Sequence, residues 1–484
     1  MMPFIKTFGI LLGFVVLTAS VSHAQADSVW MTTHGGQGLD QWNEVVLCDN
    51  GDLLVVGTTS SDLVQGNEMY VARLDSVHQC IWTYTLGQFG VETGADLVID
   101  TAGNIWCMGT VNGANTLAYD VLLIKISSDG NLITTLPISD EGMQFGQQLA
   151  FDDQHVLSIS AIEVNAQGGR DMLMYLYDIT TNEYVKYAYP QSALDLEITI
   201  TEWDSVGQQW MVAGNAFSAT SLAQVKGWGL ANDGSVLWTN AGDQNSDSLR
   251  VFDAVWKNDA WIVAASDWVE GNWRAQIVKW IPGQNIQKMG SFALTTGETV
   301  FHSVVHRSTG NGFVFGGWTY AMGAGLSDAY LHAFDDNFNW DGGAIFGGSK
   351  EDKIFSMIND RQGLLHWVGV NGSYNASMQW QGWVARLNSG FVQSSNISMV
   401  NENSACFSLS ISEPIEQTAV RFDWNQGYLS STLNVEEIKV YDLMGAMIFQ
   451  DTRFSQGAFY PASGCYIVQW KNGETYGSTK VMVY

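Results

Sequence analysis

The chain has 484 residues, of which 46% are hydrophobic, and 21 Lys and Arg residues against 49 Asp and Glu residues give it a formal net charge of −28. This excess of negative charge excludes nucleic acid and anionic membrane surfaces as partners. The length suits one large domain together with a small one.

Residues 1–24 have the pattern of a signal peptide. Lys6 precedes an almost entirely apolar run from Phe8 to Val21, and Ser-His-Ala at 22–24 is a small-x-small cleavage site. The run is too short to span a membrane, and no later stretch approaches the length of a span. The sequence therefore predicts an exported protein without a membrane span, which we expect to be a monomer.

The stretch from Gly87 to Gly130 has the pattern of consecutive short strands. Its apolar runs, rich in β-branched residues, are bounded by Gly, Asn and Asp turns. The pattern recurs along the chain, and a small residue is expected to end the second strand of each unit. Successive residues of this kind are separated by 52, 52, 53, 51, 52 and 52 positions, which indicates a repeat architecture. They are Gly57, Gly109, Ala161, Gly214, Ala265, Gly317 and Gly369.

The two ends of the repeat region are complementary. Trp82, Trp238 and Trp340 mark an outer fourth strand in their units, and a similar phrase begins at Trp30 with no unit before it. The last unit lacks a fourth strand of its own. If the N-terminal strand supplies it, the ring closes and no long edge stays unpaired. The fold class predicted for residues 25–388 is therefore all-β, a seven-bladed β-propeller.

These units resemble the SBBP-type bacterial propeller repeat. Gly87 to Thr110 carries the resemblance best, with Asp, an apolar strand, Asp-x-x-Gly-Asn and a second apolar strand that ends in Gly-Thr. The resemblance covers roughly residues 28–388. It implies a propeller that serves as a display scaffold and implies no reaction.

The period stops near Asn388, so residues 389–404 are predicted to be a linker and residues 405–484 a small β-sandwich. This module resembles the type A C-terminal sorting domain of the type IX secretion system. The resemblance implies transport by the type IX secretion machinery to the cell surface or the medium. The alternative is an ordinary terminal sandwich, because Ser412-Glu413-Pro414 stands where the family has Pro-Asn-Pro. The motif residues are Val440, Tyr441, Asp442, Gly445, Gly464, Tyr466 and Lys480.

The five cysteines leave at least one unpaired. Cys107 lies within a predicted strand and is interpreted as a buried small apolar residue. A bridge between Cys406 and Cys465 stays open, because their strands need not be neighbours.

No catalytic or metal-binding motif is present. His302 and His306 are four residues apart on a predicted strand, about 13 Å, which is too far for two ligands of one zinc ion. We therefore expect structural or channel-lining histidines. The basic residues of one strand position are expected to pair with acidic neighbours: Arg73, Lys125, Lys279 and Arg386.

A polar residue just before the innermost strand of each unit forms the candidate site. In a propeller these positions share one face, so a ring of acidic side chains would surround the central opening. Two interpretations remain: each carboxylate stabilises its own turn, or the ring binds Ca²⁺ or a cationic ligand. The residues are Asp40, Glu92, Gln144, Glu197, Asp247, Glu298 and Asp352.

Fold, export and the lack of a catalytic set predict a non-catalytic binding or adhesion scaffold for a glycan or protein ligand. The alternative is a secreted carbohydrate-active hydrolase or lyase, in which two carboxylates of a central pocket act as acid and base.

Overall fold

The computed structural model describes two parts of the chain, which form separate compact units, Met1–Ser408 and Leu409–Tyr484. The predicted signal peptide lies outside the described residues. Residues 28–387 are described except for 37, 62–65, 87–91, 113–118, 139–141, 167, 191–194, 219–220, 242–247, 293–296, 308–310, 322–325 and 374–379. Beyond them the described ranges are 398–401, 422–425, 428–442, 447–458, 464–472 and 475–483.

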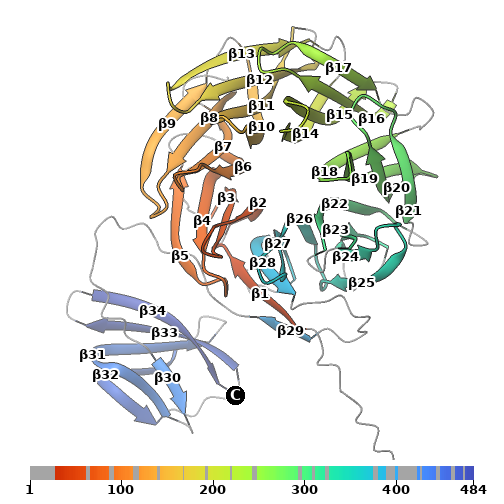
Figure 1. Cartoon of the computed structure of the whole chain (residues 1–484). Coiled ribbons are helices and arrows are strands. Elements are labelled where there is room, and N and C mark those ends of the chain that lie inside the picture. Colours follow the sequence, from red (N-terminus) through yellow and green to blue (C-terminus); the bar gives the residue numbers. More distant parts are fainter. Residues whose placement is uncertain are drawn as a thin grey trace, which may run out of the picture. The chain divides into compact units, whose positions relative to one another are not determined.

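The first unit is a seven-bladed β-propeller, as predicted (Figure 1). Each blade is an antiparallel sheet whose first strand lies innermost. Blades 1 to 3 consist of β2 (Asp40–Leu47), β3 (Leu53–Thr59), β4 (Glu68–Leu74) and β5 (Cys80–Leu86); β6 (Glu92–Ile99), β7 (Ile105–Asn112), β8 (Tyr119–Ile126) and β9 (Leu132–Ile138); and β10 (Gln144–Phe151), β11 (Val156–Val164), β12 (Arg170–Asp178) and β13 (Glu183–Tyr189). Blades 4 to 6 consist of β14 (Asp195–Asp204), β15 (Gln209–Ser218), β16 (Ser221–Leu230) and β17 (Val236–Ala241); β18 (Leu249–Lys257), β19 (Ala260–Val269), β20 (Asn272–Trp280) and β21 (Gln287–Phe292); and β22 (Thr299–His306), β23 (Phe313–Thr319), β24 (Asp328–Phe334) and β25 (Trp340–Phe346).

The N-terminal strand closes the ring in blade 7, as the sequence predicts. β26 (Asp352–Asn359), β27 (Leu365–Asn371) and β28 (Gln381–Leu387) are completed by β1 (Ser28–His34), which pairs antiparallel with β28 from Val29 opposite Leu387 to His34 opposite Gly382. A fifth strand, β29 (Ser398–Asn401), pairs in parallel with β1. The segment predicted to be a linker therefore contains a strand that extends the closing blade.

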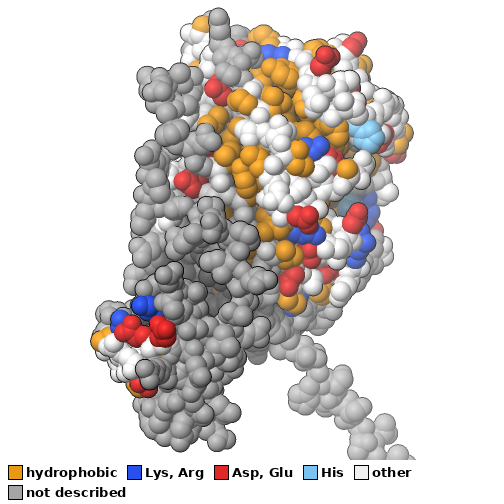
Figure 2. Space-filling view, turned by 90° about the vertical axis from the view of Figure 1, so that its left-hand side faces the viewer, with side chains coloured by type: hydrophobic (Ala, Val, Ile, Leu, Met, Phe, Trp, Pro, Cys, Tyr) orange, Lys and Arg blue, Asp and Glu red, His pale blue; other side chains and the backbone are white. Residues whose placement is uncertain are grey.

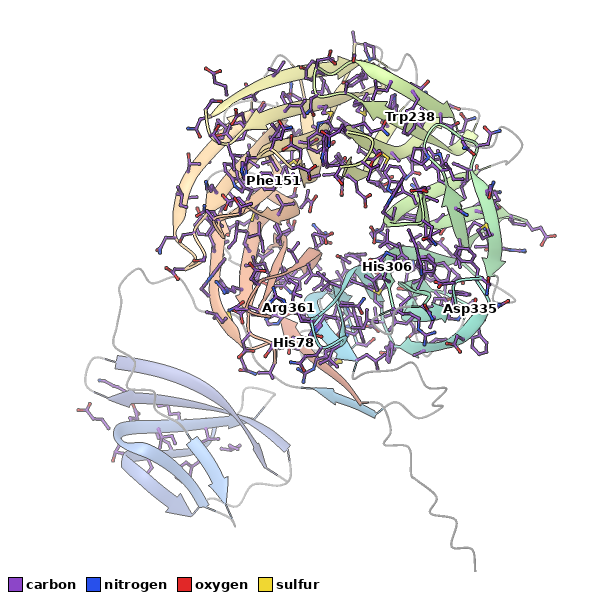
Figure 3. All side chains as sticks on the ribbon, viewed as in Figure 1. His78, Phe151, Trp238, His306, Asp335 and Arg361 are labelled. Carbon is purple, nitrogen blue, oxygen red and sulfur yellow. The ribbon has the colours of Figure 1, made fainter. Side chains whose placement is uncertain are left out.

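A chain of buried polar groups ties blade 7 to blade 1. The Nε2 atom of His78 lies 3.0 Å from Nδ1 of His366, and Nε2 of His366 lies 3.3 Å from a carboxylate oxygen of Asp360. Burial lowers the pKa of both histidines, that of His78 to about 2, so both rings are neutral. Figure 3 shows His78 and Arg361 in the same sector of the ring, where Arg361 pairs with Asp49 of blade 1. The closing seam is therefore held by side chains as well as by β1.

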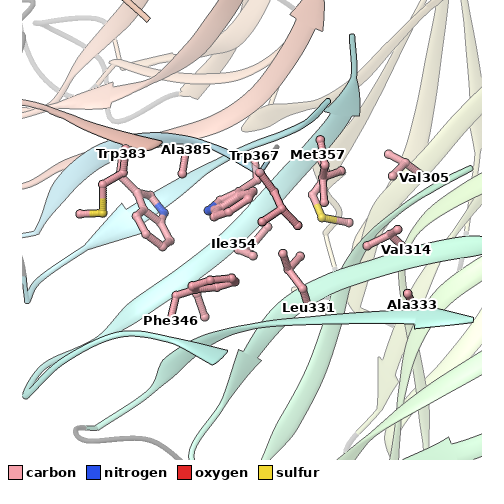
Figure 4. Packing of buried hydrophobic residues seen from close by; sticks show 14 residues of the cluster. Val305, Val314, Leu331, Ala333, Phe346, Ile354, Met357, Trp367, Trp383 and Ala385 are labelled. Atoms are coloured by element: carbon pink, nitrogen blue, oxygen red, sulfur yellow. The ribbon is translucent and has the colours of Figure 1, made fainter. Parts of the chain in front are cut away.

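Large apolar side chains fill the space between blades. Between blades 6 and 7, Trp367 and Trp383 pack edge to face with their centroids 6.0 Å apart, next to Leu331 and Met357 (Figure 4). Seven of the 20 tryptophans are almost completely buried: Trp42, Trp106, Trp210, Trp261, Trp280, Trp367 and Trp383.

The outer strands are less polar than the net charge suggests. Ile81 of β5, Ile133 of β9 and Val185 of β13 are each half exposed or more, and Figure 2 shows hydrophobic side chains among uncharged ones on this side of the ring. Within the described residues, no helix is long and apolar enough to cross a bilayer.

The predicted roles of several single residues can be compared with the structure. Lys125 pairs with Asp100 at 3.3 Å, as predicted, whereas Arg386 donates to the carbonyl oxygen of Ser76. Cys107 is completely buried and free, and Cys48 is free as well. Cys80 is disulfide-bonded; the Cys406–Cys465 bridge left open by the sequence falls outside the described residues. Arg73 pairs with Asp52 at 2.8 Å.

The second unit is a small β-sheet, and its five described strands hydrogen-bond into a single sheet. They are β30 (Phe422–Asn425), β31 (Tyr428–Asp442), β32 (Met447–Ala458), β33 (Gly464–Asn472) and β34 (Thr475–Val483). The three segments of the predicted sorting motif lie on β31, β33 and β34, which are neighbours in the sheet: Asp442 pairs with Tyr466, and Ile467 with Lys480. Gly445 lies outside the described residues.

Candidate functional site

A β-bulge interrupts the inner strand of every blade at the same place. There the register between the first and the second strand shifts by one residue, and the bulge inserts one extra residue. Except for Gln147, all of these inserted residues line the central cavity of the ring. The inserted residues are Asn43, Ala95, Gln147, Thr199, Phe252, His302 and Phe355.

The small residue that repeats along the sequence lies opposite this bulge. Gly57 pairs with Trp42, the last residue before the bulge of blade 1, and β3 continues to Thr59. The prediction that this residue ends the second strand is therefore wrong. A Cβ atom at Gly57 would fall on the backbone oxygen of Gln41, and equivalent overlaps occur at the other glycines of the series. The small residue recurs in every blade because the second strand passes close to the backbone of the inner strand next to the bulge.

All seven inner strands line one cavity of about 500 Å³ at the centre of the ring. Its wall is uneven. Blades 5, 6 and 7 contribute the half-exposed rings of Phe252, His302 and Phe355, whereas blades 1 and 2 contribute Asn43 and Ala95 at the same position. The cavity therefore has an aromatic side and a polar side.

The rings of the aromatic side are in mutual contact. The ring centroid of His302 lies 5.0 Å from that of Phe252, 5.4 Å from that of Phe355 and 5.3 Å from that of Trp318. The Nδ1 atom of His302 lies 2.8 Å from the carbonyl oxygen of Phe355, so this nitrogen donates and Nε2 is an acceptor. Burial lowers the pKa of His302 to about 4, so the ring is neutral near pH 7.

The aromatic surface continues to the mouth of the channel where the inner strands begin. Here Lys353 lies over the rings of Trp318, Tyr320 and Trp380, at 5.4, 5.9 and 5.6 Å from their centroids. Tyr320 is 41% exposed and Trp380 36% exposed. Lys353 also pairs with Glu351 at 3.5 Å, which fixes its position among the rings. Tyr320 and Trp380 are therefore partly exposed rings that share Lys353 as a contact.

Carboxyl groups next to the bulges connect neighbouring blades. Asp253 accepts hydrogen bonds from Ser303 Oγ at 2.8 Å and from the backbone N–H of Val304 at 2.9 Å, both in the next blade. Asp96 accepts one from the N–H of Leu149 at 2.6 Å, and burial raises its pKa to about 7. The oxygens of these side chains thus serve to hold blades together.

Glu44 differs from the other two because its hydrogen-bond donor in another blade belongs to the preceding blade of the ring and not to the following one. It accepts a hydrogen bond from Ser356 Oγ of blade 7 at 2.6 Å and one from the N–H of Val45 at 3.1 Å, both at Oε1. Burial, with the nearby Asp96 and Asp253 as secondary causes, raises the pKa of Glu44 well above its ordinary range. Glu44 therefore presents to the cavity a carboxyl group with a raised pKa.

The described members of the predicted ring occupy three different strand positions. Asp40, Glu92, Gln144 and Asp352 are the first residues of their inner strands. Each lies two positions before the last residue ahead of the bulge, and all four are buried. Two other members lie one residue away from this shared position. In blade 4, Leu196 occupies the equivalent place and Glu197 is one residue further. In blade 6 it is Thr299, and Glu298 precedes it. Asp247 lies outside the described residues.

The members that do share a position accept hydrogen bonds from their own surroundings. Asp352 accepts from Ser373 Oγ at 2.6 Å and from the N–H groups of Gly348 and Gly372 at 3.0 and 3.1 Å. Asp40 accepts from Ser61 Oγ at 2.7 Å and from the N–H of Gly36 at 3.0 Å. Burial raises the pKa of both carboxyls. These contacts favour the interpretation in which each carboxylate stabilises its own turn.

Other candidates from the sequence have structural roles. His302 lines the channel, and Nε2 of His306 lies 3.0 Å from the carbonyl oxygen of Trp256. Asp100 accepts the N–H groups of Ala102 and Asn104 at 3.0 and 2.8 Å, as a hairpin turn requires. Among the described residues no three His, Cys, Asp or Glu side chains are grouped so as to hold a metal ion.

No protein-family model matches the chain, and no curated protein matches its sequence. Solved structures are similar at low identity. A chain of a mitotic checkpoint complex is 12% identical, with a TM-score of 0.43, over 78% of this chain and 98% of the other. Puromycin hydrolase is 12% identical, with a TM-score of 0.44, over 68% of this chain and 50% of the other. The β-propeller domain of the Trilobed protease from Pyrococcus furiosus is 12% identical, with a TM-score of 0.36, over 59% and 79%.

Proposed function

We propose that this protein is a non-catalytic, secreted or surface-displayed binding propeller, and that its ligand is an uncharged glycan held at the aromatic side of the central channel. The observation that carries the proposal is the group of rings that Phe252, His302 and Phe355 form in the channel. Trp318 and Lys353 connect this group to the partly exposed rings of Tyr320 and Trp380. Aromatic faces pack well against the apolar faces of sugar rings. Exposed rings of this size are costly unless a ligand covers them.

The polar side of the channel supplies the complementary groups. Asn43 and Gln41 offer amide donors and acceptors for hydroxyl groups. A cavity of about 500 Å³ lies within the usual size of small-ligand sites, so one or two sugar units fit. The net charge of −28 disfavours strongly anionic glycans.

Export by the type IX secretion machinery is the second part of the proposal. It rests on the signal-peptide pattern at 1–24 and on the motif segments that β31, β33 and β34 bring side by side. Removal of the residues from Leu409 onward, the second compact unit, should leave a folded propeller that stays in the periplasm of its host. Arrival of the truncated protein in the medium would contradict the assignment of this unit as an address.

The alternative is a carbohydrate-active hydrolase or lyase. Its catalytic acid and base would have to be Glu44 and Asp253, because these are the carboxyl groups that line the cavity among the described residues. Both oxygens of Asp253 accept hydrogen bonds, from Ala254 and from Ser303 and Val304. An acid engaged in this way is poorly placed to transfer protons to a substrate. Turnover of a polysaccharide that is lost in Glu44→Gln would favour the enzyme.

A glycan array probed with the purified full-length chain tests the binding proposal. Phe355→Ala and Trp380→Ala should each weaken binding of any glycan found by about tenfold, since each removes one stacking face. Trp340→Ala is the matched control, because Trp340 is 54% exposed on the outer strand β25. Equal binding by all four proteins would remove the channel from consideration.

A further inference from the structure

A second cavity lies beside the channel mouth, at the starts of the inner strands of blades 3 to 5. It has a volume of about 430 Å³, and none of its lining residues lines the central cavity. Its wall contains two arginines, two carboxylates and three large apolar side chains. The lining is Phe145, Gln147, Ile162, Arg170, Asp195, Glu197, Phe217 and Arg250.

Arg250 is unusual among the arginines of the described propeller. Arg73, Arg170, Arg274, Arg307 and Arg361 each form an ion pair, and Arg386 donates to the carbonyl oxygen of Ser76. Arg250 forms neither kind of contact within the described residues. Its guanidinium instead lies between two rings, 4.9 Å from the centroid of Phe217 and 5.2 Å from that of Trp273.

The Nε–H group of Arg250 is buried and has no hydrogen-bond partner among the residues that the structure describes. A guanidinium cannot lose its charge by deprotonation, so an unpaired buried donor costs free energy in the folded protein. The two rings hold the plane of the guanidinium in place, and Arg250 lines the cavity. An anion in the cavity would balance its charge, and a carboxylate matches a guanidinium in a bidentate manner.

The other charged groups of the cavity are already engaged. Arg170 pairs with Asp195 at 3.0 Å, and Glu197 accepts a hydrogen bond from Asn215 at 3.2 Å. The two carboxylates in the wall would repel a ligand with two negative charges, such as a phosphate monoester. A single carboxylate restores the balance of charge, while the walls made by Phe145, Ile162 and Phe217 favour an apolar group next to it.

We propose that Arg250 anchors a second ligand site, which takes a monocarboxylate joined to an apolar or aromatic group, as at the C-terminal residue of a peptide. The carboxylate binds the edge of the Arg250 guanidinium. The apolar group packs between Phe145 and Phe217. The ring of Tyr119 stacks on Phe145 with the two centroids 5.1 Å apart and so fixes the position of Phe145. The site is independent of the glycan proposal, because the two cavities share no lining residue.

Calorimetric titration of the full-length chain with N-acetylphenylalanine tests this site. N-acetylphenylalaninamide, which lacks the negative charge, should bind at least about tenfold more weakly, and so should phenyl phosphate, which carries a second charge. A tripeptide that ends in Phe with a free carboxylate should bind at least as well as the single residue if the ligand is a peptide end. Weaker binding of the tripeptide would restrict the site to small free acids and overturn the peptide assignment.

Variants separate a binding role of Arg250 from a structural one. Arg250→Met should abolish carboxylate binding and leave the melting temperature unchanged or higher, because the unpaired donor is removed. Arg274→Met is the matched control, since Arg274 pairs with Glu270 outside the cavity. Glu197→Gln should strengthen binding of phenyl phosphate relative to N-acetylphenylalanine.

Three results would overturn the proposal: equal binding of acid and amide, wild-type affinity in Arg250→Met, or no binding of the acid at millimolar concentration. If Arg250→Met unfolds, Arg250→Lys replaces it. Lysine keeps the charge and the packing of the stem but loses the bidentate geometry, so weaker binding with a retained fold is still expected. Phe355→Ala should leave the affinity for N-acetylphenylalanine unchanged.

Discussion

The inner strands of blades 5 to 7 share the bulged backbone of the inner strands of blades 1 to 4. The two groups differ in the side chain that the bulge turns into the channel. Every one of them carries the bulge, but the inserted residue is Phe252, His302 or Phe355 on one side and a small or polar residue such as Asn43 or Thr199 on the other. This difference indicates that one position of each blade determines the fold and another determines the ligand preference. The glycine opposite the bulge maintains the backbone, while the inserted residue is free to vary.

Breaking the shared backbone should have the largest effect and should be equal on the two sides. Gly109→Val on the polar side and Gly317→Val on the aromatic side each place a side chain on a backbone oxygen of the inner strand, that of Thr93 or of Val300. We expect each to lower the free energy of unfolding by about 3 kcal/mol or more, measured by urea denaturation.

Ala161 provides the control for this pair, since blade 3 carries alanine at the same position. Ala161→Gly should cost only about 0.5–1 kcal/mol, through backbone entropy. A strong loss in only one of the two valine variants would mean that the two sides of the ring do not share one structural rule.

Removal of the inter-blade carboxyls should have the next largest effect. Asp96→Ala on the polar side leaves the buried N–H of Leu149 without an acceptor, and Asp253→Ala on the aromatic side does the same to Val304. Each should lower the free energy of unfolding by about 1–3 kcal/mol. Asp253→Asn retains an acceptor oxygen and should lose less. If the alanine variants are as stable as the wild type, these bonds do not hold the blades together.

The architecture could be predicted because its signals are periodic. A step of about 52 residues repeats the tight contact at Gly57 or Gly109, and the orphan strand at Trp30 matches the gap in the last blade. Both signals can still be recognised when the assignment of a strand is wrong by one or two residues. The closure by β1 follows from them.

The candidate site could not be predicted to the same degree because a bulge shifts the register by one residue. Beyond such a shift, alternation no longer tells which side chain faces the axis. Phe252 and Phe355 therefore carried no signal that they line the channel. Glu197 and Glu298 lie ahead of the bulge, where Leu196 and Thr299 occupy the places equivalent to Asp40; their grouping with Asp40 followed the residue type and not the position. The unpaired state of Arg250 depends on contacts between blades, for which the sequence has no local signal.

The two sides of the channel should respond to pH in opposite directions. Burial raises the pKa of Asp96 from 3.8 to about 7, so its contribution to stability is present below pH 4 and is lost as the pH rises to about 7. Burial lowers the pKa of His302 from 6.5 to about 4, so its contribution is present above pH 6.5 and is lost as the pH falls to about 4.

Urea unfolding of variants between pH 4 and 8 measures these opposite slopes. Relative to the wild type, Asp96→Asn should gain stability as the pH rises, and His302→Asn should gain stability as the pH falls. Each change should be on the order of 2 kcal/mol across this range. His78 and His366 contribute the same pH dependence to the stability of every variant. The differences between the proteins therefore report on Asp96 and His302 alone. Parallel curves for the three proteins would contradict both assignments.

The carboxylates at the mouth should have the smallest effect, and they decide whether the predicted cation site exists. Asp40 and Asp352 belong to adjacent blades, and each accepts hydrogen bonds from its own turn. Asp352→Asn keeps one acceptor oxygen and should cost about 1 kcal/mol of unfolding free energy. Glu298→Gln, which lies outside the shared position, should cost less. Because the oxygens of Asp40 and Asp352 are occupied by donors, a calcium ion would have to displace these bonds, and we expect millimolar Ca²⁺ to leave the melting temperature of all three proteins unchanged. A rise in the wild-type melting temperature that Asp352→Asn abolishes would instead establish a calcium site at the mouth, next to the aromatic rings at Tyr320 and Trp380.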